Sequence, residues 1–193
     1  MNNEEKKKLI SEKFKEIMQV LELDVENDDS LRGTPDRVAK MYVDEIFYGL
    51  QEDKFPKIMT QENRFKYDEM LIQVDIPVKS MCEHHFIPVI GVAHVAYIPG
   101  DKLIGLSKIN RIVDYYSRRP QVQEKLVVNI MDKLTEILGT ENIAVTIDAK
   151  HYCVYMRGVN QESPVTRTSQ LSGNFKNNMK TKEEYLNAIG RVK

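Results

Sequence analysis

The chain has 193 residues, of which 41% are hydrophobic and 30% are charged, and its formal net charge is −1. This length and composition are typical of a globular domain with one well-filled core. A nearly neutral chain is not expected to bind nucleic acid or an anionic membrane through its overall charge, so an anionic ligand would need a local basic cluster. No apolar run approaches the roughly 18 residues of a transmembrane helix, so no membrane partner is expected.

The cysteine content and the first residues predict the compartment. The chain has two cysteines, and residues 1–8 contain no apolar signal-peptide region. These features predict a cytoplasmic protein. In that reducing environment the two thiols are expected to be metal ligands or core residues rather than a disulfide.

Residues 1–60 are expected to form a helical region. Apolar residues recur at helical spacing over residues 4–23, and a second helix is predicted over 34–50. Thr34 is the expected N-cap of this second helix, with Pro35 at its first position. Arg37 and Lys40 lie three residues apart and can share one face; in isolation a solvated basic pair is the simpler interpretation.

Residues 61–193 are expected to form a second, catalytic domain. The elements predicted there are strands at 70–77 and 86–98, helices at 107–118 and 121–138, a strand at 143–149, its continuation or a fourth strand at 152–156, an edge strand at 165–171, and a short helix after Thr181. Ser107 is the predicted N-cap and Gly139 a predicted C-cap. Met70, Ile72, Val74 and Ile76 alternate as one strand face. Paired strands predict an α+β fold, an antiparallel sheet with helices on one face.

Two short clusters hold both cysteines and three of the four histidines. Cys82 and His85 have C-x-x-H spacing, and Cys153 is the candidate third ligand of one zinc ion. His151, two residues before Cys153 on a predicted strand, would lie beside the metal without being a ligand. His84 would lie beside it too. Three ligands indicate a catalytic site with an open position, in which these two histidines would move protons.

Other interpretations of these clusters stay open at this point. A single C-x-x-H pattern is weak, and buried free cysteines are common, so core residues or a redox pair would also fit. A structural zinc module that binds a partner is a further alternative, and it would need four protein ligands.

Two more groups suit a nucleotide. Ser107, Lys108 and Arg111 lie at a predicted helix start, where backbone N–H groups and cations suit a phosphate. Taken alone, an ordinary helix start with surface cations is the better interpretation. Gln123 and Glu124 pair an amide with a carboxylate, which can read the edge of a purine. A first-turn glutamate favoured by the helix dipole is the simpler alternative.

Five motifs together resemble the zinc-dependent GTP cyclohydrolase I family. In order along the chain they span Thr34–Tyr42, Met81–Phe86, Ile104–Val113, Arg119–Glu124 and His151–Val154. The resemblance is collinear from about Leu31 onward, and residues 1–30 match only loosely. It implies opening of the imidazole ring of GTP, release of formate, rearrangement of the ribose and closure to 7,8-dihydroneopterin triphosphate, the first step of folate and pterin synthesis.

The resemblance also implies residue roles and an assembly. The zinc ligands would be Cys82, His85 and Cys153, and the proton-transfer residues His84 and His151. The implied triphosphate contacts are Ser107, Lys108, Arg111, Arg157, Arg37 and Lys40, and the implied guanine contacts are Gln123 and Glu124. The implied fold is the tunnelling fold, assembled as a homodecamer of two stacked five-membered rings with sites between subunits. Relatives that act on pterins or deazapurines, or that stop at the ring-opened product, remain alternatives.

Overall fold

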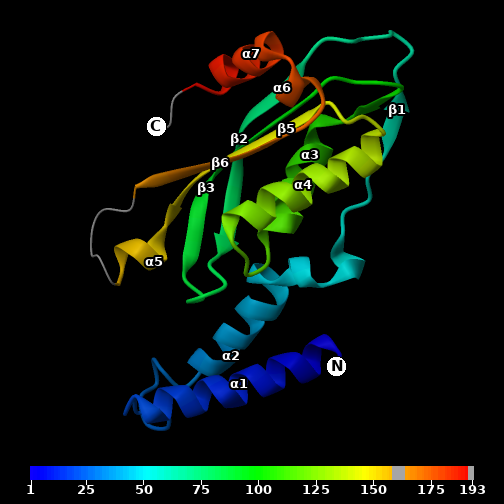
Figure 1. Cartoon of the computed structure of the whole chain (residues 1–193). Coiled ribbons are helices and arrows are strands. Elements are labelled where there is room, and N and C mark those ends of the chain that lie inside the picture. Colours follow the sequence, from blue (N-terminus) through cyan, green and yellow to red (C-terminus); the bar gives the residue numbers. More distant parts are fainter. Residues whose placement is uncertain (158–163, 191–193) are drawn as a thin grey trace. The chain divides into compact units, whose positions relative to one another are not determined.

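The computed structural model describes residues 1–157 and 164–190 (Figure 1). The chain divides into two compact units, Met1–Glu52 and Asp53–Lys193. Over the described residues, no helix combines the length and the apolar character that a membrane crossing requires. The assignment of a helical region and a catalytic domain to residues 1–60 and 61–193 stays a prediction.

The first unit consists of helices. α1 spans Asn3–Val20 and begins with a capping box formed by Asn2 and Glu5. α2 spans Thr34–Lys40 and continues as the π-helix η1, Met41–Ile46, and the 3-10 helix η2, Tyr48–Leu50. The predicted N-cap was wrong: Gly33 holds that position, because the Thr34 hydroxyl accepts a hydrogen bond from Arg37 instead of from a backbone amide.

The second unit is built on a four-stranded antiparallel sheet. Its strand order is β2 (Leu71–Met81), β3 (Pro88–Tyr97), β5 (Ile143–His151) and β6 (Val165–Leu171). The helices of this unit are α3 (Leu106–Ser117), α4 (Gln123–Leu138), α5 (Tyr152–Tyr155), α6 (Asn174–Asn177) and α7 (Met179–Ile189). The 3-10 turn η3 (Glu52–Lys54) precedes a small sheet of β1 (Thr60–Glu62) and β4 (Lys102–Ile104), which the sequence pattern did not predict.

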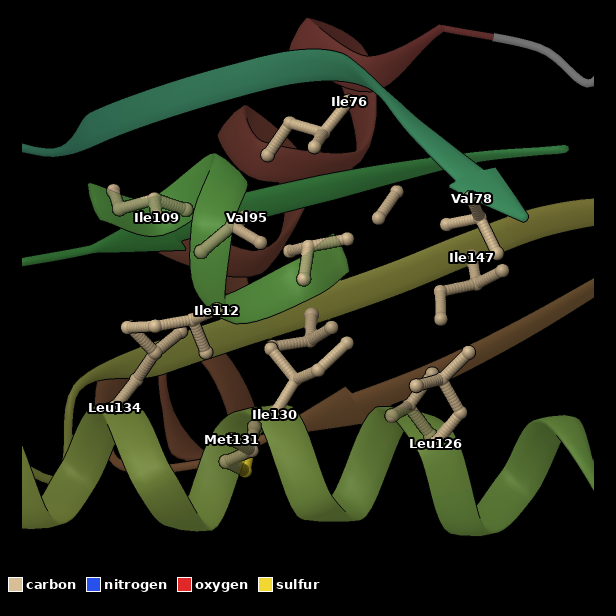
Figure 2. Packing of buried hydrophobic residues seen from close by; sticks show 14 of the residues in the cluster. Ile76, Val78, Val95, Ile109, Ile112, Leu126, Ile130, Met131, Leu134 and Ile147 are labelled. Atoms are coloured by element: carbon tan, nitrogen blue, oxygen red, sulfur yellow. The ribbon is translucent and has the colours of Figure 1, made fainter. Parts of the chain in front are cut away.

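The main core lies between the sheet and the pair α3 and α4. Figure 2 shows Val95 and Ile147 of the strands facing Ile112 and Ile130 of these helices. Alternate residues of β3 and β5 supply the sheet side of this core, as the period of two predicted. The α+β class with helices covering a face of an antiparallel sheet is therefore confirmed. The short α6 and α7 add a second, smaller core on the opposite face, where Phe175 and Tyr185 pack over Ala96 and Ala144.

A β-bulge divides β2 into two halves. The pairing with β3 shifts between Gln73 and Ile76, and Asp75 has φ of 57°. Beyond the bulge Ile76 faces the main core, whereas Ile72 packs in the smaller core on the other face. The prediction that Met70, Ile72, Val74 and Ile76 share one face was therefore wrong.

Several predicted boundaries also need correction. The predicted strand at 152–156 is the helical turn α5, because the partner strands end there: Val89 is opposite His151 and Val165 opposite Lys150. Gly105, not Ser107, is the N-cap of α3. α7 begins at Met179, earlier than the predicted start after Thr181, because the Asn178 side chain accepts hydrogen bonds from the backbone amides of residues 180 and 181. Gly139 is the C-cap of α4 as predicted, with a left-handed φ of 66°.

Candidate metal centre

The two clusters of cysteine and histidine meet at one end of the sheet. One ligand atom each from Cys82, His85 and Cys153 lies within 4.8 Å of the others. Cys82 follows directly after β2, and the turn 82–87 is closed by two backbone bonds of 2.9 Å, from Cys82 N–H to the Ile87 carbonyl and from Phe86 N–H to the Cys82 carbonyl. Cys153 reaches the same place from α5, the helical turn that directly follows β5.

The chemistry of these donors fits a zinc-like cation. Thiolate sulfur and imidazole nitrogen are the ligands that zinc prefers. Burial raises the pKa of the Cys153 thiol, and the neighbouring Cys82 thiol raises it further. Within the described ranges, no fourth cysteine, histidine or carboxylate joins the group. The protein therefore has a three-residue group that can hold a metal ion.

The two histidines proposed for proton transfer have different surroundings. His84 is exposed, with its Nδ1 atom 3.9 Å from the Cys82 sulfur and its Nε2 atom 3.8 Å from a Glu83 oxygen. His151 is half-buried at the end of β5, and its Nε2 atom lies 2.8 Å from Oε1 of Gln123. Burial lowers the pKa of His151, and the negative charge of Glu124 opposes that shift in part. A neutral His151 can accept a proton.

Gln123, Glu124 and Arg157 also belong to this end of the sheet. Gln123 and Glu124 open α4, so the backbone N–H groups of its first turn lie beside them. The Glu124 side chain is exposed and Gln123 is buried. Arg157 donates a hydrogen bond to Nε2 of His85. Arg157 thus contacts one metal-ligand candidate, and the Glu124 carboxylate is close enough to His151 to affect its pKa.

Ser107, Lys108 and Arg111 are not brought to this place within one chain. They lie in the first half of α3, where Asn110 accepts a hydrogen bond from Gln73 near the start of β2. The metal ligands follow the other end of β2, about 25 Å away at the rise of an extended strand. No side chain of the described residues caps α3, although the Lys108 amide donates a hydrogen bond to the Gly105 carbonyl at 2.8 Å.

Arg37 and Lys40 belong to the first unit. The Arg37 guanidinium donates to the Ser30 carbonyl and to the Thr34 hydroxyl within that unit. Their predicted contact with a triphosphate stays a prediction.

The sequence pattern did not find a second polar cluster on the opposite face of the sheet. There Asp148 of β5 forms two hydrogen bonds of 2.7 and 2.6 Å with Arg167 of β6, and one oxygen lies 3.4 Å from Nε2 of His94. Burial alone would raise the pKa of Asp148, but Arg167 and His94 hold it below its ordinary value. The alternation of residues 144–151 places Asp148 opposite the core face, which was the available signal.

Fold and site together define an α+β protein with a candidate catalytic metal centre. The chain belongs to the GTP cyclohydrolase I family, because the model of that family matches residues 10–190. It is 54% identical to "GTP cyclohydrolase 1" of Citrobacter koseri and 53% identical to that of Klebsiella pneumoniae subsp. pneumoniae. Each match spans 98% of this chain and 85% of the relative.

One solved structure is a distant neighbour, the crystal structure of the archaeosine synthase QueF-Like in the apo form. The match has a TM-score of 0.45 and 18% identity, and covers 55% of this chain and 94% of that one. A likeness at this distance supports no inference about the site.

Proposed function

We propose that the chain is a zinc-dependent GTP cyclohydrolase that opens the imidazole ring of GTP, releases formate and closes the product to 7,8-dihydroneopterin triphosphate. Such a reaction begins folate and pterin synthesis. The observation that carries this proposal is the meeting of Cys82, His85 and Cys153 with His151 at one end of the sheet. Membership of the family supports the choice of GTP as substrate. The expected cytoplasmic location stays a prediction.

Zinc is the metal that this donor set favours, with Cys82, His85 and Cys153 as the residues that would hold it. Bound zinc supplies a Lewis acid that activates water near neutral pH. The rival interpretation as a structural zinc module is disfavoured, since such sites are normally closed by four protein ligands and this group offers three.

The two histidines near the metal-ligand candidates are assigned to proton transfer. His151, whose pKa is lowered by burial, is available in its neutral form to take a proton from the reacting centre. His84, exposed beside the Cys82 sulfur, exchanges protons with solvent and with the rearranging ribose. We assign both to proton transfer, and neither belongs to the group of metal-ligand candidates.

Glu124 is the proposed guanine anchor. A carboxylate accepts two hydrogen bonds from the N1 and N2 groups of guanine. Its side chain is exposed at the start of α4, close enough to His151 for its charge to affect that imidazole. Gln123 was predicted to share this task, but its carboxamide is buried and already bonded to the sheet and to His151. We therefore assign guanine recognition to Glu124.

The triphosphate is proposed to bind between subunits. Ser107, Lys108 and Arg111 lie toward the far end of β2 from the metal candidates, so a second copy would have to bring them to Arg157 and the metal. The uncapped start of α3 and its two cations suit phosphate oxygens. The tunnelling-fold homodecamer of two stacked five-membered rings supplies such neighbours, and Arg37 and Lys40 would add charge.

The test is turnover of GTP by the purified chain, stripped of metal and then reloaded with zinc. We expect formate and a product that becomes fluorescent after oxidation, both only in the zinc-loaded sample. Formate without a fluorescent pterin would indicate a relative that stops at the ring-opened product. Neither signal in the zinc-loaded protein would contradict the proposal.

A further inference from the structure

The carboxamide of Gln123 is held in one orientation by the sheet. Gln123 is only 4% exposed, and its Nε2 atom lies 2.9 Å from the Ile147 carbonyl, 3.0 Å from the Thr166 carbonyl and 2.9 Å from the Thr168 hydroxyl. Carbonyl oxygens can only accept hydrogen bonds, so the NH₂ edge of the amide must face them. Turning the amide over would place its oxygen against two carbonyl oxygens. The orientation of the side chain therefore follows from its partners.

This orientation determines which nitrogen of His151 carries a proton. The remaining atom of the amide, Oε1, lies 2.8 Å from Nε2 of His151. An amide oxygen can only accept, so Nε2 of His151 must be the donor. In a neutral imidazole one nitrogen bears the hydrogen and the other the lone pair, so the lone pair belongs to Nδ1.

We propose that Gln123 is a positioning residue that fixes the ring of His151 by accepting a hydrogen bond from its Nε2 atom, and thereby holds the imidazole in the Nε2–H form. This inference rests on the proposed function for the role of His151 in proton transfer. Gln123 acts through His151, in place of the guanine contact first predicted for it. Ile147, Thr166 and Thr168, from β5 and β6, hold the amide, and the sheet thereby sets the tautomer of a residue at its end.

The test replaces Gln123 with methionine, which has a similar volume but makes no such hydrogen bonds. The matched control is Gln121→Met: Gln121 is also buried and also donates to backbone carbonyls, those of Tyr116 and Arg119. We expect Gln123→Met to lower kcat for formate release by about ten- to hundredfold, the range found for residues that hydrogen-bond to the groups of an active site and orient them. KM for GTP should change by no more than about twofold. Gln121→Met should keep both values near those of the original chain.

The direct readout is the tautomer of His151, from ¹⁵N solid-state NMR of protein labelled at histidine nitrogens. The measurement uses zinc-free protein without GTP, at a pH where the imidazole is neutral, and His151→Ala identifies the signals. We expect a single Nε2–H form in the original chain and in Gln121→Met, and a mixture in Gln123→Met. Because this readout needs no turnover, it separates failure of this inference from failure of the proposed function.

Two results would overturn the inference. One is an Nδ1–H or mixed His151 in the original chain, a result that holds even when Gln123→Met does not fold. The other is a Gln123→Met protein with unchanged tautomer and unchanged kcat but raised KM for GTP, which would return Gln123 to guanine recognition.

Discussion

Each face of the sheet holds a histidine with fixed hydrogen-bond partners, but only one of these two histidines lies next to the cysteine and histidine side chains that can hold a metal ion. On the α7 side, Nδ1 of His94 accepts a hydrogen bond of 3.2 Å from the Asp75 backbone amide, and its Nε2 lies 3.4 Å from a carboxylate oxygen of Asp148. On the α4 side, Nε2 of His151 is held by Gln123, and Cys82, His85 and Cys153 cluster at the same end of the sheet. Both nitrogens of His94 are therefore used for structure, whereas His151 lies next to a group that can hold a metal.

The α7 side also has a cavity and a histidine–aspartate pair, and we expect both to be structural. A pocket of about 460 Å³ is lined by Asp75, His94 and Asp148 on the α7 side. The Asp148 carboxylate accepts two hydrogen bonds from the Arg167 guanidinium, and Arg167 also donates to the Gly190 carbonyl after α7. Such a closed network fixes α7 and β6 to the sheet. On the other face, the two thiols and His85 form a group that can hold a metal ion.

The largest expected effect comes from removing a metal ligand. Cys153→Ser should lose bound zinc and reduce formate release to background, because two of three ligands cannot hold the ion in a fixed geometry. Metal content by mass spectrometry and a formate assay would measure both. The control is Tyr152→Phe in the same helical turn, which should keep its zinc. A Cys153→Ser protein with full zinc and full activity would refute the assignment of this ligand.

The next largest effect is a loss of stability, caused by a substitution on the α7 face of the sheet. Asp148→Asn leaves Arg167 without its carboxylate, and breaking a buried pair of this kind costs about 3 kcal/mol of unfolding free energy. Denaturant unfolding would measure it. The control is Asp114→Asn, which removes the carboxylate that forms a surface ion pair with Arg118. Its unfolding free energy should fall by less than about 0.5 kcal/mol. Equal losses in the two variants would show that the network on the α7 face is not special.

A smaller change is expected in substrate binding. Glu124→Gln should raise KM for GTP by roughly ten- to hundredfold, the equivalent of one charged hydrogen bond. Steady-state kinetics would give the value, with Glu136→Gln, an exposed glutamate near the other end of α4, as the matched control. An unchanged KM in Glu124→Gln would contradict its role as guanine anchor.

The smallest effect is the pH dependence of stability. The pKa of Asp148 is lower in the folded protein than in the unfolded chain, because Arg167 and His94 outweigh the effect of burial. Its contribution is therefore complete above the unfolded pKa of an aspartate and is lost as the pH falls through the folded value. Unfolding free energies measured from pH 7 down to pH 3 should fall less steeply in Asp148→Asn than in the original chain. Parallel curves would contradict this account.

The spacing of residue types along the chain predicted several strands, helices and caps of this structure. The alternation in β3 and β5, the apolar face of α4 and its Gly139 cap follow from residue spacing, and they are present. The spacing of Cys82 and His85, with a second cluster at Cys153, also predicted the metal group. These features depend on neighbours in the sequence, so the sequence alone could specify them.

The features that were missed depend on distant partners. The bulge at Asp75 exchanges the sheet faces to which the two halves of β2 direct their side chains, and no residue type near it indicated a bulge. Whether the chain continues as a strand after His151 depends on where β3 and β6 end. The bond between Gln123 and His151 joins residues 28 positions apart, so both could be named from motifs but their contact could not be predicted.

The most direct test compares kcat for formate release in His151→Ala and in Asp148→Asn, both zinc-loaded and assayed at a temperature where both are folded. We expect His151→Ala to lose about 10²- to 10⁴-fold, the usual contribution of a general acid or base, while it keeps its zinc. Asp148→Asn should remain within about threefold of the original chain, because its cost falls on stability. An active His151→Ala protein, or an inactive but folded Asp148→Asn protein, would contradict the division of the sheet into a reactive and a structural face.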